Sequence, residues 1–81
     1  MTHRDLRRFV VFGFATTHDA LAAETALKEG DIEAVPIPTP KALGELCGIA
    51  LRVEEPLARE ARAALDSASV SVASETTIED V

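Results

Sequence analysis

The sequence predicts an α+β sandwich in which two helices pack on one face of a four-stranded antiparallel sheet. Strand-like and helix-like apolar patterns follow one another in the order strand, helix, strand, strand, helix, strand. The 81 residues allow one small domain and no second core. This order in so short a chain is typical of the ferredoxin-like βαββαβ fold. We expect the domain to span residues 9–74, between an N-terminal tail at residues 1–8 and an acidic tail at residues 75–81.

The first strand and the first helix have adjacent patterns. Residues 9–14 are apolar on both faces, so we expect them to form a strand in the interior of the sheet. Thr16 or Thr17 can cap the helix that follows, and Asp19 places an acid in its first turn. Residues 18–29 repeat Ala and Leu at helical spacing, which predicts an amphipathic helix.

The second and third strands are separated by a proline-containing loop. Residues 32–37 have a strand pattern, and Pro36 indicates an edge position because it cannot donate a ladder hydrogen bond. Residues 41–46 are compatible with one helical turn. Residues 48–53 alternate between apolar and other positions, so the third strand directs one apolar face to the core.

The second helix and the last strand complete the pattern. Pro56 suits the first turn of a helix, and residues 57–68 contain its apolar stripe. Ser alternates with Val over residues 69–73, which predicts the last strand there, with Val70 and Val72 directed to the core.

The two helices cover only one face of the predicted sheet, so the other face is open. Period-two alternation along the first strand places Phe12 and Phe14 on one face and Val11 on the other. The open face therefore presents apolar side chains to water or to a partner, and a homodimer through this face would bury them. The first-strand residues on the open face are either Phe9, Val11 and Gly13 or Val10, Phe12 and Phe14.

Composition argues against several classes of function. Eight basic residues against fourteen acidic ones give a net charge of −6, which disfavours binding to phosphate backbones. Aromatic residues make up only 4% and include no Trp or Tyr, so base stacking is also disfavoured. No apolar run approaches the ~20 residues that span a bilayer, and the N-terminus lacks a signal-peptide pattern. We expect a cytoplasmic protein that binds neither nucleic acid nor membrane.

The single cysteine, Cys47, excludes an intramolecular disulfide. Together with His3 and His18 it does not make a structural zinc set, because such sites almost always need four ligands. A core this small is also poorly suited to enclosing a substrate. We expect no metal, no cofactor and no complete enzyme, and we favour a carrier, a regulatory module or a subunit.

The predicted topology places Cys47 near the start of the first helix. The first and third strands are antiparallel neighbours, so the end of one and the start of the other share one end of the sheet. Thr16, Thr17 and His18 begin the helix at that end. The helix dipole and free N–H groups stabilise a thiolate, and Gly48 permits the close approach of another backbone or a bulky reagent.

These residues also have less specific interpretations. Cys47 can be a buried small apolar side chain, as most single cysteines are. His18 can act as a proton acceptor or a cationic neighbour for the thiolate, or it can be an exposed side chain of the first helical turn.

Four segments stand in a distinctive order: residues 14–24, Leu27, residues 37–40 and residues 47–51. The most specific parts are the Cys-Gly pair at the start of an apolar strand and the proline-containing loop before it. Together the segments resemble a family of small bacterial selenium/sulfur carrier-like proteins. The resemblance covers roughly residues 9–74 and implies a carrier of persulfide or selenopersulfide.

On this resemblance, Cys47 would accept sulfur or selenium from a donor enzyme of the cysteine desulfurase type and pass it to an acceptor protein. Gly48, Thr16, Thr17 and His18 would surround the reacting group. Exchange of this kind depends on the thiolate fraction of the attacking thiol. The protein would then be a substrate of other enzymes and not itself an enzyme.

The sequence also allows a non-catalytic interaction or regulatory module, because the ferredoxin-like fold hosts many such domains. A single reactive thiol can in addition serve as a redox sensor. An exposed Cys47 with amide N–H groups directed at it would favour the carrier. Burial of Cys47 among Ile and Leu side chains would favour a structural module.

Overall fold

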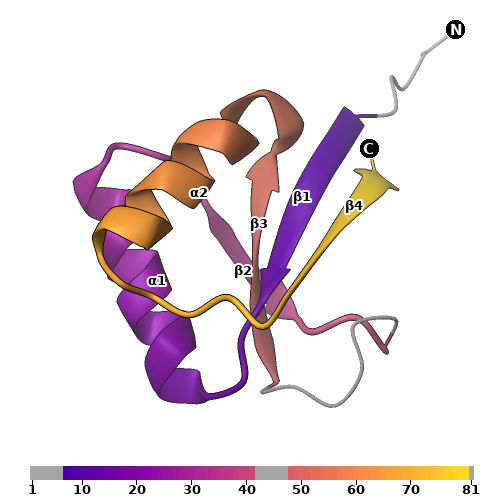
Figure 1. Cartoon of the computed structure of the whole chain (residues 1–81). Helices are drawn as coiled ribbons and strands as arrows, with labels where there is room; N and C mark the ends of the chain where they lie inside the picture. Colours follow the sequence, from indigo (N-terminus) through magenta and orange to yellow (C-terminus); the bar gives the residue numbers. More distant parts are fainter. Residues whose placement is uncertain (1–6, 42–47, 81) are drawn as a thin grey trace, which may run out of the picture.

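In a computed structural model of the chain, residues 7–41 and 48–80 are described. Their elements follow the order expected of the α+β ferredoxin-like sandwich, and this confirms the predicted fold (Figure 1). The bounds are β1 (Arg7–Gly13), α1 (Thr17–Glu29), β2 (Val35–Pro38), β3 (Ile49–Glu54), the short 3₁₀ helix η2 (Glu55–Leu57), α2 (Ala58–Ser67) and β4 (Ser74–Asp80).

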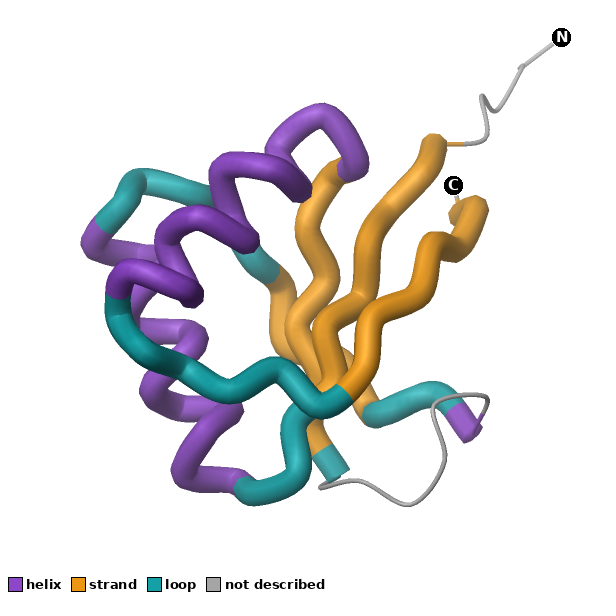
Figure 2. The backbone as a smooth tube through the Cα atoms, viewed as in Figure 1, coloured by secondary structure: helices purple, strands orange, loops and turns teal. Residues whose placement is uncertain are grey.

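The four strands form one antiparallel sheet in the order β2-β3-β1-β4. β1 lies inside the sheet, where Phe12 pairs with Leu51 of β3 and with Glu75 of β4. Both helices lie on one side of this sheet (Figure 2). β1 is therefore the interior strand that its apolar sequence predicts, and β2 is the predicted edge strand.

The core lies between the sheet and the helices. Alternate residues of β1 and β3 meet the buried faces of α1 and α2, where alanines allow close packing. Phe12 and Phe14 belong to this core whereas Val11 does not, which confirms the predicted division of faces. The buried cluster comprises Val10, Phe12, Phe14, Ala20, Ala23, Leu27, Ile32, Leu51, Val53, Ala58, Ala61 and Leu65.

The open face of the sheet differs from the prediction. Phe9 and Val11 lie on this face, yet Phe9 is only 5% exposed and Val11 is fully buried within the single chain. The guanidinium carbon of Arg52 lies 4.2 Å from the centroid of the Phe9 ring, and that of Arg7 lies 5.6 Å from it. Long arginine side chains therefore help to cover these apolar residues with their stems and planar ends, without a partner molecule.

The position of the last strand is a correction. The strand is Ser74–Asp80 and not residues 69–73, so residues 75–80 of the expected acidic tail form the edge strand that pairs with β1. Ser69 has a φ of 58°, and the N–H of Val70 donates to the Leu65 carbonyl at 2.9 Å. This left-handed turn ends α2, and residues 70–73 then lead to the strand, where the Ala73 N–H donates to the Gly13 carbonyl at 2.9 Å. Val70 packs against the core as predicted, but Val72 is 38% exposed.

The second strand also begins later than predicted, at Val35. Asp31 has a φ of 57° at the end of α1, and the N–H of Ile32 donates to the Leu27 carbonyl at 2.9 Å. Ile32 is consequently part of the core next to the helix and not part of the strand. The predicted helical turn at residues 41–46 lies outside the described residues from residue 42 onward.

Candidate functional site

The candidate site is the end of the sheet where β1 finishes and β3 begins. Gly13 at the end of β1 pairs with Ala50, so the chain just before Ala50 and the connection from β1 to α1 meet at this end (Figure 1). Gly48 is the first described residue before β3, and it is exposed. Cys47, the predicted reactive residue, lies outside the described residues.

The start of α1 has the predicted cap. Thr16 has extended backbone angles, φ −135° and ψ 156°, and its Oγ1 accepts a hydrogen bond from the Asp19 N–H at 3.1 Å. Thr16 is therefore the N-cap, and Thr17 is the first helical residue. A helix supplies no acceptor for its first N–H groups, which here belong to Thr17 and His18. Thr16, Thr17 and His18 are all exposed.

His18 projects from the first turn of α1 and is exposed, which agrees with the less specific of its two interpretations. An exposed imidazole in this position remains accessible to a partner protein. Its assignment as a proton acceptor or cationic neighbour stays a prediction.

Gly48 joins the loop before β3 to the sheet. Its carbonyl accepts a hydrogen bond from the Thr39 N–H at 3.1 Å, which ties the chain just after β2 to the chain just before β3. Among the described residues, a Cβ added to Gly48 would meet no heavy atom within 4 Å beyond its own neighbours in the chain. The approach of large groups to Gly48 stays a prediction.

A side-chain ion pair lies elsewhere, between α2 and β4. Arg62 donates from Nε to the two carboxylate oxygens of Glu75 at 2.9 and 3.0 Å, and a terminal nitrogen donates to Oε2 at 2.5 Å. These hydrogen bonds hold the pKa of Glu75 below its usual range and raise the pKa of Arg62. This pair was not predicted, because Glu75 was expected to lie in an acidic tail and not in a strand.

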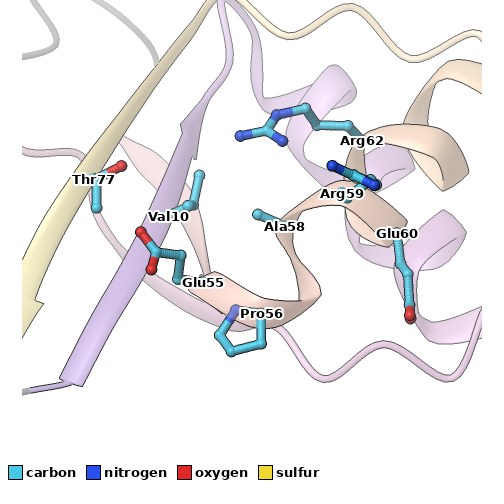
Figure 3. Close-up of a pocket in the computed structure, with 8 residues that line it drawn as sticks. All are labelled: Val10, Glu55, Pro56, Ala58, Arg59, Glu60, Arg62 and Thr77. Carbon is cyan, nitrogen blue, oxygen red and sulfur yellow. The ribbon is translucent and has the colours of Figure 1, made fainter.

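A hollow of about 450 Å³ lies at the opposite end of the sheet (Figure 3). It opens between the start of α2 and the paired strands β1 and β4, next to Val10 and Thr77. Its lining includes two acidic residues, Glu55 and Glu60, and two arginines, so the formal charges of the lining sum to zero. None of the predicted site residues lines it, so its chemistry is separate from that of the candidate site.

Within residues 7–41 and 48–80, no group of three or more His, Cys, Asp or Glu side chains is placed to hold a metal ion. In the same residues, no helix has both the length and the apolar character needed to cross a membrane.

The described elements form a small ferredoxin-like domain, and its one cysteine directly precedes Gly48 in the sequence. The chain belongs to the family described as "Putative Se/S carrier protein-like", whose sequence profile matches residues 9–75. This confirms the resemblance. The comparison with curated proteins found no significant match, and the comparison with solved structures found none either.

Proposed function

We propose that the protein is a sulfur or selenium carrier in which Cys47 holds the transferred atom as a persulfide or selenopersulfide. Membership of the Se/S carrier protein-like family over residues 9–75 is the observation that supports this function. The exposed Gly48 next to Cys47, in open space, is compatible with docking of a donor protein there.

The transfer is an exchange reaction that needs no external oxidant or reductant. Cys47 first loses its proton to solvent, and its thiolate attacks the outer sulfur of a persulfide on the donor enzyme. The sulfur–sulfur bond of the donor breaks, and the donor cysteine leaves as a thiolate. Cys47 then holds the transferred sulfur, which the thiolate of an acceptor removes by the same reaction. For selenium, the thiolate attacks the outer selenium of a donor selenopersulfide, and the donor cysteine again leaves as a thiolate.

The local electrostatics proposed for Cys47 come from α1. A helix N-terminus corresponds to roughly half a positive elementary charge, and its first N–H groups lack intrahelical acceptors. At the start of α1 these groups belong to Thr17 and His18. Both effects increase the thiolate fraction of a neighbouring cysteine at neutral pH. We assign Cys47 as the reacting residue and Gly48, Thr16, Thr17 and His18 as its surroundings.

The partners follow from the same chemistry. The donor is an enzyme of the cysteine desulfurase type that forms a persulfide, and the acceptor is a protein or enzyme that consumes it. The carrier performs no complete reaction cycle alone, so it is a protein substrate and not an enzyme. The cytoplasm, where thiols stay reduced, is the compartment in which this chemistry operates.

Intact-mass analysis tests the proposal. The purified protein is incubated with a cysteine desulfurase and cysteine, and Cys47→Ser is the matched control. We expect the wild type to gain one sulfur atom that dithiothreitol removes, and Cys47→Ser to gain none while keeping the wild-type circular dichroism spectrum. Equal sulfur addition to both proteins would contradict the proposal. Unfolding of Cys47→Ser, together with no sulfur on the wild type, would replace it with an interaction module in which the thiol only packs.

A further inference from the structure

The two edges of the sheet differ in their capacity to accept another strand. β2 is four residues long and contains Pro36 and Pro38, which have no N–H to donate. Prolines and short length are common devices that prevent pairing at an edge. β4 is seven residues long and contains no proline. Among the described elements, none pairs with the outer side of β4 (Figure 1).

The two faces of β4 have different chemistry. On the face that points toward the helices, Glu75, Thr77 and Glu79 are exposed. On the other face Thr76 and Ile78 are half-buried, and Ile78 pairs with the buried Phe9 of β1. Successive side chains of a strand point to opposite faces. Every second side chain of an added strand would therefore lie beside the carboxylates of β4, and the remaining ones would lie beside Ile78 on the other face.

A second copy of this chain is a poor occupant of the edge. Antiparallel self-pairing centred on Thr77 would place Glu75 opposite Glu79 twice, once on each side of the centre. Like charges directly opposite one another destabilise a strand pair. β4 itself contains no basic residue, so the cations near these carboxylates belong to other elements: Arg62 of α2 binds Glu75, and Arg8 of β1 lies opposite Glu79.

We propose that β4 binds an extended segment of a partner protein as a fifth strand of the sheet, and that this segment alternates basic with apolar residues. Main-chain hydrogen bonds supply the affinity, as in other cases of strand addition. The basic side chains lie beside Glu79 and Glu75, and the apolar ones extend the row formed by Phe9 and Ile78. The net charge of −6 attracts such a segment from a distance.

This surface does not depend on Cys47 or on sulfur transfer. Every binding measurement is therefore repeated with Cys47→Ser, which should bind the segment as the wild type does. No sulfur uptake by the wild type, with retained peptide binding, would reject only the carrier function. Sulfur uptake by the wild type without peptide binding would reject only the strand-addition surface.

The probe is a synthetic peptide of alternating Lys and Val, titrated at low salt into ¹⁵N-labelled protein and followed by NMR. We expect shift changes that concentrate on β4 and slower amide exchange there. The matched control is a peptide of alternating Lys and Pro, which keeps the charge but loses the backbone N–H of every second residue and is therefore poorly suited to pairing in a ladder. Equal binding of the two peptides would overturn the proposal, because charge alone would then explain the binding. Absence of Lys-Val binding, or shift changes away from β4, would also overturn it.

Variants of β4 give a second test. Glu79→Lys should weaken Lys-Val binding about threefold or more, because a cross-strand attraction becomes a repulsion. An unchanged affinity of this variant for the Lys-Val peptide would contradict the placement of basic side chains beside Glu79. An oligomer in light scattering that a folded proline variant of β4 abolishes would assign the edge to a second copy and overturn the proposal.

Proline variants test the backbone directly. Outward N–H groups alternate along an edge strand, so of Thr76→Pro and Thr77→Pro one removes an outward donor and the other disrupts pairing with β1. The variant that retains the wild-type circular dichroism spectrum should lose Lys-Val binding. A folded proline variant that binds as the wild type does would overturn strand addition. If both variants unfold, the Lys-Pro peptide still decides the question.

Discussion

At the scale of single residues, the contact between Arg62 and Glu75 matters because it links α2 to a strand that the sequence alone does not reveal. The two groups are hydrogen-bonded through both carboxylate oxygens, although each side chain remains partly exposed to water. Exposed pairs are weakened by solvent and salt, and they typically contribute ~1 kcal/mol or less. Their effect is therefore best detected through its dependence on pH.

We expect Glu75→Gln to lower the free energy of unfolding near pH 7 by less than ~1 kcal/mol. The pKa of Glu75 is lowered in the folded protein, so its stabilisation is present above the unfolded-state pKa. That stabilisation disappears as the pH falls through the folded-state pKa, and wild type and variant should then converge. Urea unfolding between pH 7 and pH 3 measures this, with Glu79→Gln as the exposed control. A constant difference at all pH values would contradict the prediction.

For the thiol itself, we expect alkylation of Cys47 by iodoacetamide to follow an apparent pKa below the model-peptide value of ~8.5. The physical reason is the expected proximity to the N-terminus of α1. The rate is measured from pH 5 to pH 10, and Cys47→Ser reports any background reaction. A midpoint at or above ~8.5 would count against the carrier chemistry.

At the scale of elements, α1 shows how a local pattern specifies its own boundaries. The hydroxyl of Thr16 satisfies the Asp19 N–H, and the N–H of Gly30 donates to the carbonyls of Ala26 and Leu27 at the other end. All of these partners lie within four residues in the chain, so the sequence pattern alone predicts the start and end of the helix.

Thr16→Ala should lower the free energy of unfolding by about 1 kcal/mol, within a range of about 0.5–2, because the capping acceptor is lost. Thr17→Ala is the matched control, since Thr17 is also exposed but lies inside the helix. Urea unfolding at neutral pH compares the two. Equal losses would show that the cap hydrogen bond has no special role in stability.

β4 is an element that depends on distant partners. It pairs along its whole length with β1, from Ser74 opposite Gly13 to Asp80 opposite Arg7. We therefore expect deletion of residues 75–81 to reduce the free energy of unfolding by about 2 kcal/mol or more, because several ladder hydrogen bonds each contribute ~1 kcal/mol. Thermal unfolding measures the change, and deletion of Val81 alone is the control. A truncated protein as stable as the full chain would restore the interpretation of this segment as a tail.

At the scale of the whole molecule, stability depends on a small core. A chain of 81 residues has a free energy of unfolding of roughly 4–12 kcal/mol at typical values per residue. One large cavity in the layer between the sheet and the helices can therefore remove a substantial part of it.

We expect Leu65→Ala to lower the free energy of unfolding by about 2–5 kcal/mol, because Leu65 is 1% exposed and its removal leaves a cavity. Leu21→Ala is the control, since Leu21 is 56% exposed on α1, and it should change stability by less than ~0.5 kcal/mol. Urea unfolding of both variants measures the two changes in the free energy of unfolding. Similar losses would mean that Leu21 is buried in solution, for example in an oligomer.

The candidate site could be predicted only in part. The cap at Thr16 and the exposed start of α1 follow from local sequence, and the meeting of β1 with β3 follows from the order of elements. The hydrogen bond between Thr39 and Gly48 has no sequence signal, because neither residue type requires it. The surroundings of Cys47 stay a prediction, and the sulfur-transfer and alkylation experiments test them.

What the sequence by itself determined is the order of the elements, the division of the first strand's side chains between two faces and the ends of α1. These depend on periodicity and on hydrogen bonds between near neighbours in the chain. The tertiary structure alone decided which C-terminal segment completes the sheet. Residues 69–73 alternate as a strand should, but the left-handed turn at Ser69 and the contact of Ala73 with Gly13 leave residues 74–80 to pair with β1. It also decided that Arg52 stacks on Phe9 and that Arg62 binds Glu75. Such contacts join residues far apart in the chain, so they exist only once the sheet has formed.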